Sequence, residues 1–186
     1  MAPLIQAFKE KSEIFDLKVC TTSQHRQMLD QVLEVFEIRP DFDFNLMKND
    51  QDLTNLTSSI LLEMKNLFLK FSPEILLVHG DTTTTFATSL AAFYYSIPIG
   101  HVEAGLRTYD LKAPYPEEFN RQITTKIANW HFTPTSLSKK NLISEGIKNS
   151  SISVTGNTVI DAMNWVLKKI QRDKDLKEKI IKKLTK

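Results

Sequence analysis

Two short apolar segments, separated by one segment of helix length, constrain the fold of this chain more than any other feature. Residues 75–79 read ILLVH and residues 97–102 read IPIGHV, and residues 83–95 between them form an expected helix. A strand, a helix and a second strand in this order favour parallel pairing through a right-handed crossover. The segment therefore predicts a βαβ unit, and with it a protein of the α/β class.

The same alternation continues along the rest of the chain, where further strands are expected at 17–21, 131–133 and 152–155. Further helices are expected at 2–12, 24–36, 53–71, 117–130, 135–145 and 158–170. A chain with this pattern forms a parallel sheet with helices on its faces. We therefore expect a Rossmann-like α/β fold.

Both ends of the chain differ from those of a complete doubly wound domain. Such a domain usually begins with its central strand, whereas this sequence begins with an expected helix. Residues 168–186 are rich in Lys and Arg and carry apolar residues at helical spacing, without the aromatic residues that stack on bases. We expect residues 1–170 to form an incomplete N-terminal domain, residues 171–186 to form a basic helical tail, and the chain to be part of a longer protein.

Composition places the chain among ordinary globular proteins, since 41% of its residues are hydrophobic and 25% are charged. Its apolar runs are far shorter than the roughly 20 residues that cross a bilayer, and its first residues lack the pattern of a secretory signal. We therefore expect a cytoplasmic protein without membrane or nucleic-acid partners. The single cysteine, Cys20, lies in an expected strand and is expected to be a buried structural thiol.

Polar side chains gather where the two strands of the βαβ unit end. His79 and Asp81 follow the first apolar run, and His101 and Glu103 follow the second. Side chains two residues apart along a strand point to the same face, so each pair can face one crevice. Ligands bind at the carboxyl ends of the strands in open parallel sheets. The sequence therefore predicts a binding or catalytic site at this edge.

These residue types allow more than one chemistry. Neighbouring carboxylates in a partly desolvated cleft shift each other's pKa values apart, so Asp81 and Glu103 can serve as acid and base. The set His79, Asp81, His101 and Glu103 also suits a catalytic divalent metal, as in a metal-dependent hydrolase. Structural roles are open as well, because Asp81 can cap the helix that follows it and Arg107 can pair with Glu103.

A further acidic pair, Glu117 and Glu118, follows Pro116 at an expected helix start. Carboxylates there are favoured by the helix dipole, and one of them can also face the crevice. Arg121, one turn later, is spaced to pair with Glu117.

Three uncommon strings occur in order along this region: HGDTTTT at 79–85, HVEAGLRT at 101–108 and PEEFNR at 116–121. They resemble the non-hydrolysing UDP-N-acetylglucosamine 2-epimerases, as do TTSQHRQMLDQVL at 21–33, FTPT at 132–135 and VTGNTVIDA at 154–162. The resemblance implies two Rossmann-like domains facing each other, as in the glycosyltransferase-B group. This chain would be the first domain without its first strand, and we expect it to be inactive alone. A related sugar-nucleotide glycosyltransferase is an alternative.

The activity implied by the resemblance is an isomerisation that serves the synthesis of cell-surface polysaccharide precursors. UDP-GlcNAc and UDP-ManNAc are interconverted by elimination of UDP to 2-acetamidoglucal and its re-addition. This chemistry implies no cofactor and no metal. The resemblance also implies a homodimer of the full-length protein.

Residue roles also follow from the resemblance. It assigns catalysis to Asp81, Glu103 and Glu117, and substrate contacts to Asp81, Glu103, His101 and Arg107. Gln24 and Gln27 match positions of an effector site for a second UDP-GlcNAc, although Ser59 replaces an Arg expected in the next helix.

Overall fold

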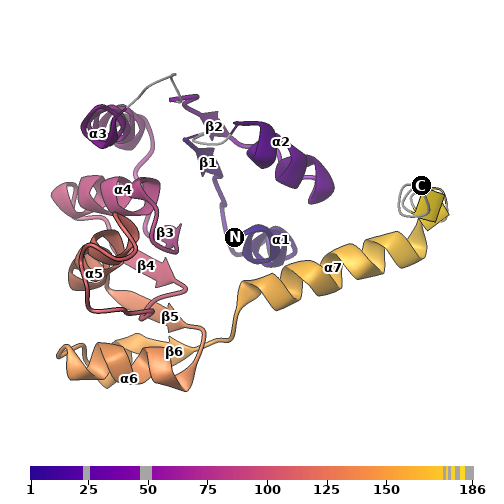
Figure 1. The fold of residues 1–186 in the computed structure, drawn as a ribbon. Coiled ribbons are helices and arrows are strands. Elements are labelled where there is room, and N and C mark those ends of the chain that lie inside the picture. The colour runs from indigo at the N-terminus through magenta and orange to yellow at the C-terminus, as the bar shows by residue number, and fades with distance from the viewer. Residues whose placement is uncertain (23–25, 47–51, 174, 176, 179–180, 183–186) are drawn as a thin grey trace. The chain divides into compact units, whose positions relative to one another are not determined.

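A computed structural model describes residues 1–22, 26–46, 52–173, 175, 177–178 and 181–182 (Figure 1). The chain divides into two compact units. The first consists of residues 1–20, 27–42 and 158–186, and the second consists of residues 21–26 and 43–157. None of the helices in the described part of the chain has the length and apolar composition of a membrane span.

The second unit contains a four-stranded sheet whose neighbouring strands are all parallel. Its strands, in spatial order, are β3 (Leu76–His79), β4 (Ile99–Val102), β5 (Trp130–Thr133) and β6 (Ile152–Val154). In the register, His79 lies beside Val102, and Val102 lies beside Phe132. The carboxyl ends of β3 and β4 therefore meet at one edge, as the sequence predicts.

Four α-helices accompany this sheet: α3 (Leu53–Lys70), α4 (Thr83–Tyr94), α5 (Glu117–Ile127) and α6 (Ser136–Ser144). Helix α4 packs against α3 and α5 and contacts β3 and β4, whereas α6 contacts β5 and β6. The buried residues of α4 are small, and they include Ala87, Ala91 and Ala92. Small side chains allow neighbouring elements to approach closely, while Ile60 and Met64 of α3 fill the remaining space as fully buried residues.

The first unit has a small core around Val19, Phe36 and Ile38, against which Ile5 and Trp165 pack. It contains α1 (Ala2–Lys9), nearly all of α2 (Arg26–Val35) and α7 (Thr158–Arg172), and α1 packs against α7. The rings of Phe36 and Trp165 lie 4.8 Å apart between centroids. Strands β1 (Cys20–Thr21) and β2 (Phe42–Asp43) form a separate two-stranded sheet.

The structure confirms the α/β fold class and corrects details of the expected elements. The strand expected at 17–21 is reduced to Cys20–Thr21, and the helix expected at 117–130 ends at Ile127 because Trp130 begins β5. Cys20 is exposed rather than buried, since alternation along the strand buries its neighbour Val19 instead. The division into a domain at 1–170 and a tail at 171–186 stays a prediction.

Two glycines with positive φ allow a matched test of packing around α6. A side chain at Gly105 (φ +87°) would place its Cβ 2.4 Å from the Ser138 carbonyl oxygen, whereas a Cβ at Gly146 (φ +84°) would meet no atom within 4 Å. Gly146→Ala is therefore expected to cost roughly 1–2 kcal/mol of unfolding free energy, the usual cost of a left-handed residue. Gly105→Ala adds overpacking against backbone and should cost roughly 3 kcal/mol or more. Urea unfolding measures both, and equal costs would contradict the packing assignment.

Candidate active site

The turn that follows β3 carries Asp81 and is held at three consecutive carbonyl oxygens. The His79 carbonyl accepts a hydrogen bond from Thr85 Oγ1 at 2.6 Å, and the Gly80 carbonyl contacts His101 Nε2 at 2.7 Å. The Asp81 carbonyl accepts from Asn120 Nδ2 at 2.9 Å. These side chains come from α4, β4 and α5. The backbone that carries Asp81 is therefore fixed from three sides.

Glu103 follows β4 and lies against the same turn. Its Oε2 is 3.8 Å from His79 Nε2, and a Cβ at Gly80 would lie 3.4 Å from that oxygen. Glu103 has a positive φ of 64°, a conformation that is uncommon for residues other than glycine. Strained residues of this kind cluster at functional sites. Burial lowers the pKa of His79 to about 4, so its ring is neutral near pH 7 and the contact with Glu103 is not a full ion pair.

Of the three carboxylates predicted for the site, Asp81 interacts electrostatically with each of the other two. Burial raises the pKa of the Asp81 carboxyl, Arg121 opposes this shift, and the charge of Glu117 adds to it. Burial also raises the pKa of Glu103, and the charge of Asp81 raises it further. Repulsion of this kind separates proton affinities, which is the condition for one group to hold a proton while another accepts one. Asp81 is the carboxylate that links the other two.

Arg121 joins Asp81 to a buried carboxylate that the sequence analysis did not assign. Its Nη1 lies 3.0 Å from Asp81 Oδ2, and its Nε donates to Glu118 Oε2 at 2.6 Å. Its Nη2 also pairs with the same oxygen of Glu118. The expectation that Arg121 pairs with Glu117 is therefore wrong, because the guanidinium points to the neighbouring acid and to the turn after β3.

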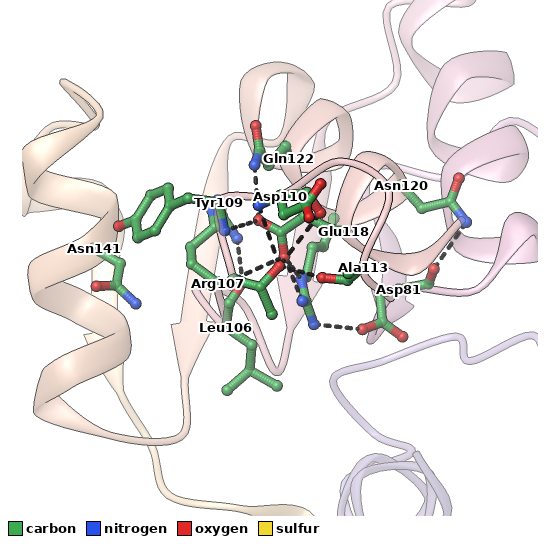
Figure 2. Close-up of polar contacts among 12 residues, drawn as sticks. Asp81, Leu106, Arg107, Tyr109, Asp110, Ala113, Glu118, Asn120, Gln122 and Asn141 are labelled. Carbon is green, nitrogen blue, oxygen red and sulfur yellow. Dashed lines mark hydrogen bonds and ion pairs between the residues drawn. The ribbon is translucent and has the colours of Figure 1, made fainter. Parts of the chain in front are cut away.

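Glu118 is fully buried and lies at the centre of the polar contacts in Figure 2. Besides Arg121, its carboxylate accepts hydrogen bonds from the backbone N–H groups of Thr108 and Tyr109, both at 3.0 Å, and from Gln122 Nε2 at 2.7 Å. Burial alone would raise the pKa of Glu118, but the hydrogen bonds from Gln122, Thr108, Arg121 and Tyr109 outweigh it and lower the pKa to about 2. Glu118 is therefore a permanently charged anchor for the loop after β4.

A signal for Glu118 was present in the sequence. Arg121 and Gln122 stand three and four residues after it, and side chains at these spacings meet on a helix. The same spacing places Asn120 and Arg121 within reach of Glu117. The spacing alone therefore does not show which of the two acids is buried, and the position of the loop after β4 is needed to decide it. Glu118, whose carboxylate lies within reach of both Arg121 and Gln122, is the acid that is buried.

The capping role considered for Asp81 is performed by its neighbour. Thr82 is the N-cap of α4, and its Oγ1 accepts a hydrogen bond from the Thr85 N–H at 3.2 Å. The side chain of Asp81 is thereby left for the ion pair with Arg121. Its orientation is set by α5 and not by the helix that it precedes.

Arg107 and His101, both predicted to contact the substrate, make contacts within the protein in this structure. Arg107 donates from Nε to Glu145 Oε1 at 2.6 Å and from Nη2 to Thr125 Oγ1 at 2.9 Å, so its partner is Glu145 and not Glu103. His101 is fully buried, and its ring contacts the Gly80 carbonyl. Direct contact of His101 or Arg107 with a substrate stays a prediction.

The remaining predicted positions lie elsewhere in the chain. Gln24 lies outside the described residues, and Gln27 is exposed on α2. Ser59 is half-buried in α3. The effector site therefore stays a prediction.

The metal-dependent hydrolase considered from the sequence lacks a suitable ligand set in this geometry. Among the residues that the structure describes, no group of three or more His, Cys, Asp and Glu side chains is placed to hold a metal ion. Of the histidines considered as ligands, His101 already uses its Nε2 in the contact with the Gly80 carbonyl. The residues at the end of β3 and β4 are better suited to proton transfer.

Comparisons with known proteins find similarity to one family. A family model described as UDP-N-acetylglucosamine 2-epimerase matches residues 6–186. A protein of that name from Campylobacter jejuni is 53% identical over 181 residues, which cover 97% of this chain and 47% of that protein. One from Salmonella typhimurium is 58% identical over 166 residues, which cover 89% of this chain and 44% of that protein.

Solved structures give the same family. UDP-GlcNAc 2-epimerase from Neisseria meningitidis bound to UDP-GlcNAc matches with a TM-score of 0.93 and 50% identity, over 100% of this chain and 50% of that chain. The enzyme from Methanocaldococcus jannaschii in complex with UDP-GlcNAc and UDP matches with a TM-score of 0.83 and 32% identity, over 94% and 47% of the two chains. This chain thus spans about half the length of the relatives it matches.

The buried His101 makes acid stability a test of the site. Burial lowers its pKa from 6.5 to about 4, so the folded pKa lies below the unfolded one. The stability that this neutral ring contributes is therefore complete above pH 6.5 and is lost as the pH falls towards 4. The loss is at most roughly 3 kcal/mol. Because the pKa of His79 and of His131 is also lowered, the same trend remains in part without His101.

The measurement is urea unfolding at pH 7.5 and pH 4.5 for the wild type and for His101→Gln. We expect the variant to lose less stability between the two pH values than the wild type does. The assignment is wrong if both proteins lose the same amount.

Proposed function

The chain belongs to the UDP-N-acetylglucosamine 2-epimerase family, and we propose that the whole protein interconverts UDP-GlcNAc and UDP-ManNAc. The observation that supports this most directly is the group of carboxylates around Asp81. Asp81 and Glu103 have raised pKa values, and Glu117 contributes to that of Asp81. Inversion at a carbon whose proton is weakly acidic requires groups that can take and return a proton at neutral pH.

The proposed reaction has two balanced stages. In the first, a base removes the proton at C2 of the sugar while the bond between C1 and the UDP oxygen breaks, which leaves a C1–C2 double bond and free UDP. In the second, UDP adds back at C1 and a proton is delivered to the opposite face of C2. The two faces require two differently placed proton carriers, and Asp81, Glu103 and Glu117 are the candidates. Since no hydride is transferred, no cofactor takes part in this proposal.

Other parts of the proposal follow from the family and not from the geometry. We place the activity in the cytoplasm, in a homodimer, and in the supply of precursors for cell-surface polysaccharides. The related glycosyltransferase is less favoured, because the family model that matches residues 6–186 is that of the epimerases.

Solvent isotope exchange tests the reaction itself. Full-length protein incubated with UDP-GlcNAc in deuterium oxide is expected to form UDP-ManNAc and to carry deuterium at C2 of both sugars. The rate should be unchanged by EDTA. Mass spectrometry and proton NMR follow the exchange, and activity that is lost on chelation and restored by zinc would contradict the proposal.

The carboxylates are tested by isosteric substitution. Asp81→Asn, Glu103→Gln and Glu117→Gln are each expected to lower kcat by roughly 10²-fold or more, the usual scale for a positioned acid or base. Glu74→Gln is the matched control, because Glu74 is exposed and precedes β3 at the end of the strand opposite to Asp81. Near-normal turnover of Asp81→Asn would remove Asp81 from the proposed chemistry.

A further inference from the structure

Arg121 occupies a position between two carboxylates of different character. Its side chain is 10% exposed, as against 28% for Asp81 and 0% for Glu118. The Nε and Nη2 edge of the guanidinium faces Glu118, and Nη1 reaches Asp81 Oδ2 at 3.0 Å. The Arg121 guanidinium therefore pairs both with Glu118, which solvent cannot reach, and with Asp81, which solvent can reach.

We propose that Arg121 is a positioning residue for Asp81, and that Glu118 fixes Arg121 in the orientation that this role requires. The inference rests on the proposed function in one respect, namely that Asp81 acts on the substrate. The contacts that define the arrangement do not depend on that assumption.

The geometry of the guanidinium explains why an arginine is needed. It is planar and carries five N–H donors in a fixed fork, so two edges can bind two carboxylates at the same time. A lysine ammonium on a flexible stem acts as a point charge and does not fix the angle between its partners. Arg121 thereby determines where the Asp81 carboxylate lies relative to α5.

Glu118 supplies the fixed end of this arrangement. Its carboxylate accepts hydrogen bonds from the backbone N–H groups of Thr108 and Tyr109, and from Gln122, which lies beside it in Figure 2. These contacts leave it little freedom to move. Because these donors lower the pKa of Glu118 to about 2, its carboxylate is charged at neutral pH. The loop after β4 and the side chain of Asp81 are therefore coupled through two residues of one helix.

The charges around Asp81 make the role of Arg121 measurable. The groups that act on the Asp81 carboxyl are Arg121 and Glu117, both from α5, and Glu103 responds to it from the end of β4. Arg121 is the cation among them and lowers the pKa of Asp81 against the effect of burial and of Glu117. Removal of Arg121 leaves burial and the charge of Glu117, which raise the pKa of Asp81, opposed by the hydrogen bond from the Asp81 backbone N–H.

The first test measures Asp81 directly and needs no enzymatic activity. In full-length protein labelled with ¹³C at the aspartate carboxyl carbons, the Asp81 signal is assigned by its loss in Asp81→Asn and is titrated by NMR. Arg121→Gln is expected to raise the pKa of Asp81 by about one unit or more, the usual effect of an opposite charge at this distance. Lys126→Gln is the matched control, because it removes the same charge from an exposed position on the same helix and should leave the titration unchanged.

Two further variants keep the test decisive if Arg121→Gln does not fold. The double variant Glu118→Gln with Arg121→Gln removes both buried charges together, so neither is left unpaired, and it should show the same raised pKa. Arg121→Lys keeps a cation and should give an intermediate value. An Asp81 pKa that stays at the wild-type value in these folded variants would overturn the proposal and reduce Arg121 to a structural ion pair.

The second test uses the reaction. The limb of the pH profile of kcat/KM that Asp81 controls, acidic if Asp81 is the base and alkaline if it is the acid, should move to higher pH in Arg121→Gln by the same amount as the NMR pKa, and not move in Lys126→Gln. An Asp81 pKa that rises without any movement of the profile would show that Asp81 does not control the rate, and would overturn the positioning role. Wild-type protein without epimerase activity would instead overturn the proposed function, while the NMR titration would still decide whether Arg121 controls Asp81.

Discussion

The candidate site depends on hydrogen bonds to three consecutive carbonyl oxygens in the turn after β3. The donors stand on α4, β4 and α5, so the turn is fixed only when these elements are packed together. A single hydrogen bond contributes about 1 kcal/mol to stability, but a buried carbonyl left without a donor costs more than that. The packing of the unit and the position of Asp81 are therefore determined by the same contacts. A site built in this way is organised before any ligand arrives, which is what proton transfer requires.

Glu118 and Arg121 extend this arrangement into the loop after β4. Charges at such depth are costly, and breaking a buried pair by removing one partner typically costs about 3–5 kcal/mol. Burial removes the Glu118 carboxylate from water. Hydrogen bonds from two backbone N–H groups, from Gln122 and from Arg121 offset this loss of hydration. The same contacts give the loop a fixed path. Fold stability and site geometry are thus linked in α5, where the two acids of the PEE string have different duties.

The sequence predicted the elements around the site well because its signals there are local. Strand β3, helix α4 and strand β4 follow apolar runs with clear boundaries, and parallel strands necessarily bring their carboxyl ends to one edge. Strand β1 was overestimated at 17–21, because a strand extends only as far as its partner, and β2 is itself two residues long.

The partners of the arginines could not be predicted for a different reason. Arg107 pairs with Glu145, 38 residues away, and Arg121 reaches back 40 residues to Asp81. Such pairs depend on side-chain rotamers and on the path of the loop after β4, which no local pattern records. The resemblance to a family named the carboxylates, whose catalytic role stays a prediction, but the contacts of Arg121 with Asp81 and Glu118 became visible only in the folded chain.

The left-handed backbone of Glu103 sets protein stability against the proposed chemistry. Glycine would adopt its φ of 64° without strain, and asparagine tolerates that region better than glutamate does. Either replacement would relieve strain of order 1–3 kcal/mol and would also remove the carboxylate beside the turn after β3. A search for more stable variants of this protein would therefore select against Glu103, as it would against other non-glycine residues with positive φ such as Ser96 and Tyr109. We expect replacements of Glu103 to raise thermostability and to lower activity, a trade-off that is common at strained active-site residues.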